Sequence, residues 1–352
     1  MDDALVRIQG VRKHFPIQRG ILRHTVGWIK AVDGVDLELG RGETLGIVGE
    51  SGSGKTTIAR VVAGLIDATA GNVLFAGGGQ VVDITTLDAK GKKTARRHMQ
   101  MIFQDPYSSL NPRMPVLEIV GEPLIAHRQA SGAALKERVA ALLESVGLQS
   151  GHMNVYPHEL SGGQRQRIGL ARALALGPEL IICDEPVSAL DVSVQAQILN
   201  LLLQMQQNRG LSYLFIAHSL SVVGWMSDRI AVMYLGRVVE IAGGMELYRR
   251  PLHPYTEALL WNYPVPDPAV SRRRQVLVGE IPSPANPPSG CPFHTRCPHA
   301  EERCRTEVPQ LEEVAPGHWS ACLRWQEVEL RGRPIWQSEK GQAEKGQAEE
   351  TP

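Results

Sequence analysis

The sequence lacks the marks of several broad protein classes. It contains no run of 18 apolar residues, so we expect no membrane-spanning helix. Its first residues, MDDALVRIQG, are acidic and contain no apolar stretch of the kind that a secretory signal needs. Five cysteines in 352 residues are too few for a disulfide scaffold, so the reducing cytoplasm is the expected compartment.

An excess of charge of either sign is also absent. The chain has 37 Lys and Arg residues and 37 Asp and Glu residues, which gives a formal net charge of zero. This balance argues against a protein that holds nucleic acid by bulk electrostatics, although it does not exclude a local basic patch. The length exceeds what one hydrophobic core usually fills, so we expect at least two domains.

Short apolar runs alternate with helical periodicity over residues 1 to about 260. The runs Thr44–Val48, Leu180–Cys183 and Tyr213–Ala217 are typical of strands that are buried on both faces of a parallel sheet. Helical spacing of apolar residues follows in Ile58–Leu65 and in Val194–Met205. The alternation predicts an α/β domain.

The last part of the chain has a different composition and less periodic patterning. The runs Ile230–Tyr234 and Arg237–Ile241 predict a hairpin, and from about Pro251 prolines are frequent and periodicity is lost. Residues 329–352 include a tandem KGQAE repeat, and we expect this tail to be disordered.

A glycine-rich loop carries the clearest chemistry. Residues 49–56, GESGSGKT, fit the pattern G-x-x-x-x-G-K-[ST] between an apolar run and a helical period. Glycines let backbone N–H groups converge on phosphate oxygens, and the following helix directs its positive end at them. We expect Lys55 to reach the β- and γ-phosphates and Thr56 to place its hydroxyl on Mg²⁺. The expected ATP-binding residues of this phosphate loop are Gly49, Glu50, Ser51, Gly52, Ser53, Gly54, Lys55, Thr56 and Thr57.

Two carboxylates end a second apolar run. The segment LIICDEP, residues 180–186, places Asp184 and Glu185 at the end of a predicted strand. Side chains alternate along a strand, so the two carboxylates point in different directions and need separate roles. We expect Asp184 to hold Mg²⁺ and Glu185 to polarise the attacking water.

A third motif makes a family resemblance visible. The segment LSGGQ precedes a predicted helix with Ile168, Ala171 and Leu174 on one side. Together with the two nucleotide motifs, it resembles the signature sequence of the ATP-binding cassette (ABC) family. There the signature meets the γ-phosphate held by the opposite subunit, so the resemblance implies a head-to-tail dimer with ATP at the interface. The signature residues are Leu160, Ser161, Gly162, Gly163 and Gln164.

The resemblance implies roles for further positions. Gln104 resembles the Q-loop glutamine, which reaches Mg²⁺ or the attacking water, and the implied Mg²⁺ ligands are Thr56, Gln104 and Asp184. His218 resembles the switch histidine at the γ-phosphate, although Ser219 follows it where the family often has Asp. Phe15 resembles the aromatic residue that stacks on adenine, with an ordinary core or surface phenylalanine as the alternative. The D-loop, which crosses the dimer interface in the family, corresponds to Ser188, Ala189, Leu190 and Asp191.

Longer strings narrow the resemblance. Residues 104–114, 156–174, 183–198, 251–260 and 282–298 are similar to the ATPase subunits of bacterial oligopeptide and dipeptide importers, and the third string is closer to the F-type subunit than to its D-type partner. The implied fold is an α/β P-loop domain in residues 1–250. It would combine a RecA-like core, a helical subdomain at about 105–163 and an antiparallel β-subdomain. A small Pro- and Cys-rich module would follow at 251–328.

This resemblance implies a transport ATPase at the cytoplasmic face of the cell membrane. Its partners would be a second ATPase subunit, by preference D-type, two permease subunits and an extracytoplasmic binding protein, with no nucleic acid. Peptides are the leading cargo, with nickel, glutathione or oligosaccharides as alternatives. A soluble ABC ATPase of DNA repair or translation usually has paired cassettes, a coiled coil or basic segments, which this sequence lacks. A regulatory subunit with a dead site does not fit the complete set of motifs.

Four cysteines, Cys291, Cys297, Cys304 and Cys322, fall within 32 residues. Their spacing differs from the paired C-x₂-C of zinc ribbons, so it leaves Zn²⁺, a [4Fe–4S] cluster or no metal open. Some importer ATPases with a similar pattern carry an iron–sulfur cluster, and this resemblance favours [4Fe–4S] in a structural role.

Residues 18–30 resemble an insertion in the same subunit type. They place Trp28 and Ile29 beside Arg19 and Lys30. We expect a plain surface loop, with contact to a permease or to lipid as the alternative.

Overall fold

The computed structural model describes residues 4–20, 24–105, 109–188, 190–262, 277 and 279–333. Within these residues no helix is long and apolar enough to cross a membrane. The expected tail at 329–352 lies almost wholly outside the described residues, and so does Ala189 of the expected D-loop.

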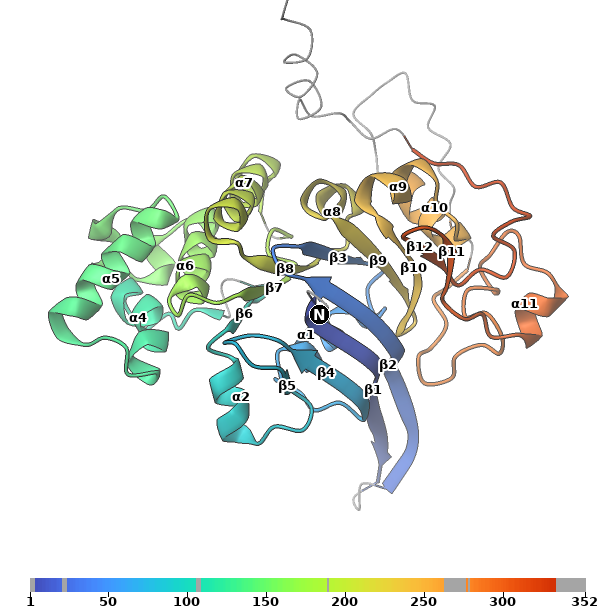
Figure 1. Ribbon diagram of the computed structural model, residues 1–352, viewed down its shortest axis with the longest axis horizontal. Coiled ribbons are helices and arrows are strands. Elements are labelled where there is room, and N and C mark those ends of the chain that lie inside the picture. The colour runs from blue at the N-terminus through green and yellow to red at the C-terminus, as the bar shows by residue number, and fades with distance from the viewer. Residues whose placement is uncertain are drawn as a thin grey trace, which may run out of the picture.

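An eight-stranded sheet forms the centre of the described chain, in the order β11-β12-β10-β9-β3-β8-β7-β6 (Figure 1). Its parallel part consists of β6 (Met99–Ile102), β7 (Leu180–Asp184), β8 (Ser212–Ile216), β3 (Thr44–Val48) and β9 (Arg229–Tyr234). Every residue of β3, β7 and β8 is buried, as expected for strands covered on both faces. The three predicted buried strands are therefore confirmed, with ends that differ by at most one residue.

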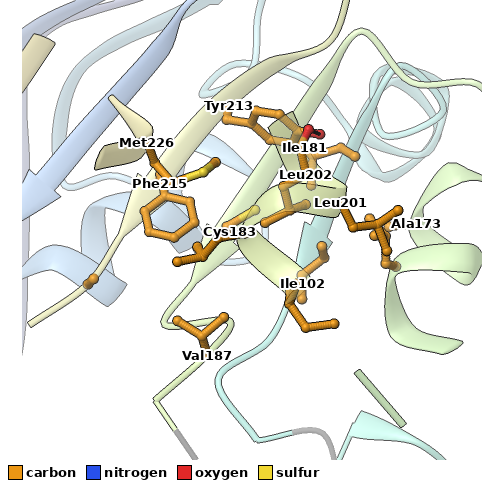
Figure 2. Close-up of a cluster of buried hydrophobic side chains, with 14 of the residues drawn as sticks. Ile102, Ala173, Ile181, Cys183, Val187, Leu201, Leu202, Tyr213, Phe215 and Met226 are labelled. Carbon is orange, nitrogen blue, oxygen red and sulfur yellow. Dashed lines mark hydrogen bonds between the residues drawn. The ribbon is translucent and has the colours of Figure 1, made fainter. Parts of the chain in front are cut away.

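One face of this sheet is covered by α6 (Gly162–Leu174), α7 (Val192–Arg209) and α8 (Leu220–Met226). Alternate strand residues project into the core on this side, and Figure 2 shows part of it. The labelled side chains are Ile102, Ala173, Ile181, Cys183, Val187, Leu201, Leu202, Tyr213, Phe215 and Met226. Cys183, the cysteine outside the cluster of four, is thus a fully buried core residue.

The opposite face packs on α1 (Lys55–Val62) and on a second, antiparallel sheet in the order β2-β1-β4-β5. Its strands are β1 (Ala4–Arg19), β2 (His24–Gly40), β4 (Ala70–Phe75) and β5 (Val82–Asp83). Helix α1 ends at Val62, because Gly64 takes a left-handed φ of 62°, and Leu65 lies exposed beyond it. The predicted helical period is therefore wrong for Leu65.

The long strands β1 and β2 correct the prediction for residues 18–30. They pair antiparallel from Ala4 and Gly40 out to Arg19 and His24, so the described part of the segment is the outer end of a β-hairpin rather than a loop. Figure 1 shows this hairpin extending beyond the sheet. Alternation of exposed and half-buried residues is weak there, so period-2 patterning gave no signal for strands.

A helical region lies at the β6 end of the main sheet (Figure 1). After α2 (Ala89–Ala95), it contains α4 (Val116–Ala126), α5 (Gly132–Ser145) and the short 3₁₀ turns η1 (Ser150–Asn154) and η2 (Pro157–Glu159). Val120, Leu124, Val139 and Leu143 are fully buried between these helices and α6. Helix α6 thus belongs to both this region and the main core, which ties the signature segment to the sheet.

The C-terminal part of the chain extends the main sheet. Strand β10 (Arg237–Gly243) forms the predicted hairpin with β9 and then pairs with β12 (His318–Ser320), which in turn pairs with β11 (Glu312–Ala315). The short helices α9 (Gly244–Arg249), α10 (Pro254–Trp261) and α11 (Glu302–Thr306) complete this part. The carboxylate of Glu240, which is fully buried, accepts bonds from the backbone N–H groups of Leu252 and His253 and lies 2.8 Å from Nε2 of His318. This network joins β12 and the segment before α10 to β10.

Candidate functional site

Four neighbouring strands of the main sheet direct their carboxyl ends at one place. The phosphate loop follows β3, His218 follows β8, Asp184 ends β7 with Glu185 directly after it, and Gln104 follows β6. Ligand sites of open α/β sheets lie at such edges, because loops converge there without crossing the core. The fold therefore brings motifs from 170 residues of sequence into one site.

The phosphate loop is shaped by close backbone approaches. A Cβ atom on Gly54 would lie 2.2 Å from the carbonyl oxygen of Ala31, and one on Gly49 would lie 2.2 Å from that of Met233. Gly54 also has a φ of 103°, in the left-handed region that side chains disfavour. The glycines are therefore required by the packing of the loop against β2 and β9 as well as by access to phosphate.

Lys55 lies at the centre of this loop. Its Nζ donates to the carbonyl oxygens of Gly49 at 2.7 Å and Glu50 at 2.9 Å, and to Oγ of Ser53 at 3.3 Å. Burial lowers the pKa of the ammonium, and the nearby carboxylates, above all that of Glu185, act in the opposite direction. A buried cation at a helix N-terminus is suited to hold an anion.

The two carboxylates at the end of β7 have different partners, as expected, although Glu185 lies just beyond the strand. Oδ1 of Asp184 accepts a 2.9 Å bond from Oγ1 of Thr56, and burial raises the pKa of Asp184 while this bond works against the rise. Glu185 has a left-handed φ of 49°, which is strained for a residue with a Cβ atom. Its Oε2 accepts a 2.9 Å bond from Nε2 of Gln104 and lies 3.6 Å from Nδ1 of His218. Asp184 thus faces the loop and Glu185 faces the Gln104 and His218 side chains.

The signature segment forms the start of α6. Ser161 is the N-cap: its Oγ accepts from the Gln164 backbone N–H at 3.3 Å, and Oε1 of Gln164 accepts from the Ser161 N–H at 2.9 Å. Ser161 is exposed and Leu160 is buried. A Cβ atom on Gly163 would lie 2.6 Å from Cγ1 of Val194 on α7. Within the described residues the Ser161 and Gln164 capping bonds are local, and the Ser161 side chain at the helix start is exposed.

The described part of the expected D-loop connects Glu185 to α7. The backbone N–H and Oγ of Ser188 both donate to the carbonyl oxygen of Glu185. Asp191 is the N-cap of α7, and bonds from Val194 N–H and the Ser193 hydroxyl lower its pKa. Leu190 packs against the main core. A movement of this turn would therefore reach the Glu185 backbone directly.

Phe15 lies on β1, opposite Ile29 of β2. Its ring is about one third exposed and has the ammonium of Lys13 at 5.0 Å from its centroid. Ile29 is two residues from Ala31, whose carbonyl lies against Gly54 of the phosphate loop. Phe15 is therefore a partly exposed aromatic residue on the hairpin beside the loop.

Two residues that the sequence analysis did not single out also contact the phosphate loop. The Glu50 N–H donates to the hydroxyl of Tyr255 at 2.7 Å, and the Glu50 carboxylate accepts two bonds from Arg296. Tyr255 and Arg296 are 205 and 246 residues from Glu50. Both lie in strings that resemble importer ATPases, 251–260 and 282–298, but nothing in those strings indicates a contact with the phosphate loop.

The four clustered cysteines line one cavity of about 20 Å³, together with His253 and Phe293. Burial raises the pKa of the Cys297 thiol to about 11 and that of Cys322 to about 12, and neighbouring thiols add to the rise. Burial lowers the pKa of His253 to about 3, so its ring is neutral, and Nδ1 accepts from the Tyr255 N–H. Within the described chain no group of three or more His, Cys, Asp or Glu residues has an arrangement ready for a metal ion. The four thiols therefore line one cavity and are soft ligands of the kind that metal ions such as zinc and iron accept, but their arrangement is not preformed for a metal ion.

Family comparisons match two parts of the chain. The family described as ABC transporter matches residues 32–188, and the family described as oligopeptide/dipeptide transporter, C-terminal region, matches residues 239–304. The second match covers Cys291, Cys297 and Cys304.

The chain is also similar to named proteins over most of its length. It is 52% identical over 323 residues to the oligopeptide transport ATP-binding protein AppF of Bacillus subtilis, with 91% of this chain and 97% of that protein covered. A putative peptide import ATP-binding protein of Brucella ovis is 52% identical over 323 residues, with 92% and 98% covered.

Solved structures share the fold of the larger part of the chain. The dimeric post-hydrolysis state of the ATP-binding cassette MJ0796, bound to ADP and phosphate, superposes with a TM-score of 0.59 at 29% identity, covering 68% of this chain and 98% of that one. CbiO1 from Clostridium perfringens, part of the ABC transporter complex cbiONQ, gives 0.58 at 25% identity, covering 70% and 91%.

Proposed function

The chain belongs to the ABC transporter family, and from that premise we propose that it is the ATP-hydrolysing subunit of a bacterial importer that takes up oligopeptides or dipeptides. The carrying observation is the meeting of Lys55, Asp184 and Glu185 at one sheet edge. The similarity to peptide import ATP-binding proteins supports the transport role.

The geometry supports a division of labour at the nucleotide. The loop residues 49–57 would hold the phosphates through backbone N–H groups, and Lys55 would neutralise charge that develops on the γ-phosphate. Thr56, Asp184 and Gln104 would hold Mg²⁺, which when bound neutralises phosphate charge. The hydrogen bond between Thr56 and Asp184 supports this set of ligands, because it places two of the three side chains next to each other.

Glu185 is our candidate for the group that orients and polarises the attacking water. Its contacts with Gln104 and His218 keep the carboxylate at the site, and its strained backbone is of the kind found at functional positions. His218 would contact the γ-phosphate, and Phe15 would stack on adenine.

The second half of each site would come from another subunit. Ser161 and the glycines that follow present an exposed helix N-terminus, which suits a γ-phosphate held by a partner's loop. We therefore propose a head-to-tail dimer in which the D-loop, residues 188–191, crosses the interface. The partner we favour is a D-type ATPase subunit rather than a second copy.

The proposed complex lies at the cytoplasmic face of the cell membrane. This chain would contact two permease subunits through its helical region, and an extracytoplasmic binding protein would deliver the cargo to the permease. Peptides are the proposed cargo, with nickel, glutathione or oligosaccharides as alternatives within the same machinery. We propose no nucleic-acid partner.

For the four cysteines we propose a structural [4Fe–4S] cluster, with Zn²⁺ as the alternative. All four cysteines line one cavity, which supports four-thiolate ligation, and a bound cation would lower the thiol pKa values that burial raises. Bound there, the group would connect the turn segment that contains Cys291 and Cys297 to α11, which contains Cys304, and to Cys322 just after β12.

The test of the proposal is hydrolysis by the purified chain with its co-assembling subunits, in the presence and absence of membranes that contain the permease. Stimulation of ATP hydrolysis by the permease and by peptide-loaded binding protein supports it. An ATP hydrolysis rate that is the same with and without the permease would contradict coupling of hydrolysis to transport.

A further inference from the structure

The phosphate loop is held from outside by the C-terminal module. Nη1 and Nη2 of Arg296 donate to the two carboxylate oxygens of Glu50 at 2.6 Å and 3.0 Å, and the Tyr255 hydroxyl accepts from the Glu50 backbone N–H. The guanidinium thus forms a two-pronged bond with the second residue of the loop. Such a planar pair fixes direction as well as distance.

This contact is shielded from water. The Arg296 side chain is 5% exposed and that of Glu50 is 24% exposed, and Tyr255 is fully buried. Screening by salt is weak for such a pair, and loss of one partner leaves the other charge poorly solvated. The pair is therefore a firmer constraint than the surface ion pairs elsewhere in the module, such as those of Arg303 with Glu301 and Glu327.

Arg296 is itself fixed by the packing around the cysteines. Its backbone N–H donates to the carbonyl oxygen of Phe293 at 3.0 Å, and it directly precedes Cys297. The fully buried Phe293 ring packs at 5.3 Å from the rings of both Tyr234 and Tyr255. The guanidinium lies 5.9 Å from the Tyr234 ring centroid. The Arg296 guanidinium and the Tyr255 hydroxyl, which both bond to Glu50, are therefore held by one cluster of packed aromatic rings.

We propose that Arg296 is a positioning residue for ATP binding, which holds the phosphate loop in its binding shape through Glu50. The proposal rests on the proposed function of that loop as the ATP site. Lys55 Nζ bonds to the carbonyl oxygens of Gly49 and Glu50, so a displacement of Glu50 moves the anchor of the phosphate-binding ammonium. Glu185, Gln104 and His218 come from other strands and keep their own contacts. Loss of Arg296 therefore weakens ATP binding and leaves the rate at saturating ATP largely intact.

The experiment uses the full-length chain with its co-purifying subunits, and measures the Kd for ATP together with KM and kcat. Arg296→Ala is expected to raise Kd and KM by about tenfold, the effect of one lost charge-assisted bond, with kcat within about twofold of the parent. Arg296→Lys keeps the charge without the two-pronged geometry and is expected to restore part of the affinity. In the double variant Glu50→Gln with Arg296→Ala, the increase in KM should be no larger than in Arg296→Ala alone, because both changes remove one interaction.

Arg303→Ala is the matched control, because it removes an arginine of the same module whose ion pairs, among the described residues, are with Glu301 and Glu327. If Arg296→Ala raises KM no more than Arg303→Ala does, the inference is wrong. If Arg296→Ala does not fold, Arg296→Lys and Glu50→Gln decide, and an unchanged KM in both overturns the inference. The Lys55→Ala variant distinguishes failure of the Arg296 inference from failure of the proposed ATP site. If Lys55→Ala weakens ATP binding and the Arg296 variants do not, only the inference falls, whereas unchanged binding in Lys55→Ala overturns both.

Discussion

The side-chain amide of Gln104 donates a 2.9 Å hydrogen bond to Oε2 of Glu185, across 81 residues of sequence. The same oxygen lies 3.6 Å from the imidazole of His218. Strands β6, β7 and β8 are neighbours in the sheet, so their carboxyl ends bring these three groups together. A carboxylate held in this way is oriented before any nucleotide arrives, which is the property that a water-positioning group needs.

We predict that Glu185→Gln keeps ATP binding and nearly abolishes hydrolysis. The carboxamide retains the shape and the bond with Gln104 but is a far weaker base, and positioned general bases contribute about 10²–10⁴-fold to rates. The measurement is ATPase rate beside nucleotide binding, with size-exclusion chromatography to detect a trapped dimer. Hydrolysis close to the parental rate would show that another group acts on the water.

Lys55→Ala should have the opposite pattern, with a loss of affinity for ATP. Removal of a bond from a charged donor costs about 1.5–3 kcal/mol, which corresponds to an increase in Kd of about 10- to 100-fold. Titration with a fluorescent ATP analogue measures this change. Lys92→Ala is the control, because Lys92 pairs with the exposed carboxylate of Asp67. If the Lys55→Ala and Lys92→Ala variants bound ATP with equal affinity, Lys55 would not be an ATP-binding residue.

Ser161→Arg should act on the partner's site rather than on this chain's own. The change removes the N-cap of α6 and places a long cation on the exposed helix start. Trapping of labelled nucleotide in the heterodimer is expected to show this chain's own loop occupied and the site on the partner's loop impaired. Ser131→Arg, at the N-cap of α5, is the matched control. Loss confined to this chain's own loop would contradict the head-to-tail arrangement.

An anaerobic preparation of the chain should contain about four irons and absorb broadly near 400 nm, as a [4Fe–4S] cluster does. Cys297→Ser is expected to lose the iron and the absorption, whereas Cys183→Ala should keep both, because Cys183 is a core residue that does not line the cavity. Metal analysis and visible spectroscopy make the measurement. Stoichiometric zinc without iron would favour the alternative, and no metal in the anaerobic protein would contradict both.

Much of the fold follows from local patterns in the sequence. The predicted buried strands and the hairpin about Gly236 are confirmed, because continuous apolar runs and a glycine turn are strong short-range signals. Asp184 and Glu185 have different partners, as expected, but strand alternation is not the reason, because β7 ends at Asp184 and Glu185 takes a left-handed φ of 49°. Their catalytic roles stay predictions.

Other features depend on long-range packing that no local pattern records. Residues 18–19 and 24–30 lie in β1 and β2 rather than in the expected loop, and they lack the regular alternation of buried and exposed positions that would indicate strands. The contact of Arg296 with Glu50 joins residues 246 positions apart and lies beside the aromatic packing of Phe293, which only the folded chain brings together. Strands β11 and β12 were not predicted, because they have only four and three residues and lie in a proline-rich part of the chain without periodic patterning.

The most direct test of the central claim is ATP hydrolysis by this chain, assembled with its partner ATPase and permease in lipid vesicles, with peptide-loaded binding protein added on the permease's outer face. We predict hydrolysis that rises on addition of the loaded binding protein and that is lost in Glu185→Gln, with peptide accumulating inside only when ATP is hydrolysed. A parental rate that does not respond to the loaded binding protein, or that persists in Glu185→Gln, would contradict the account.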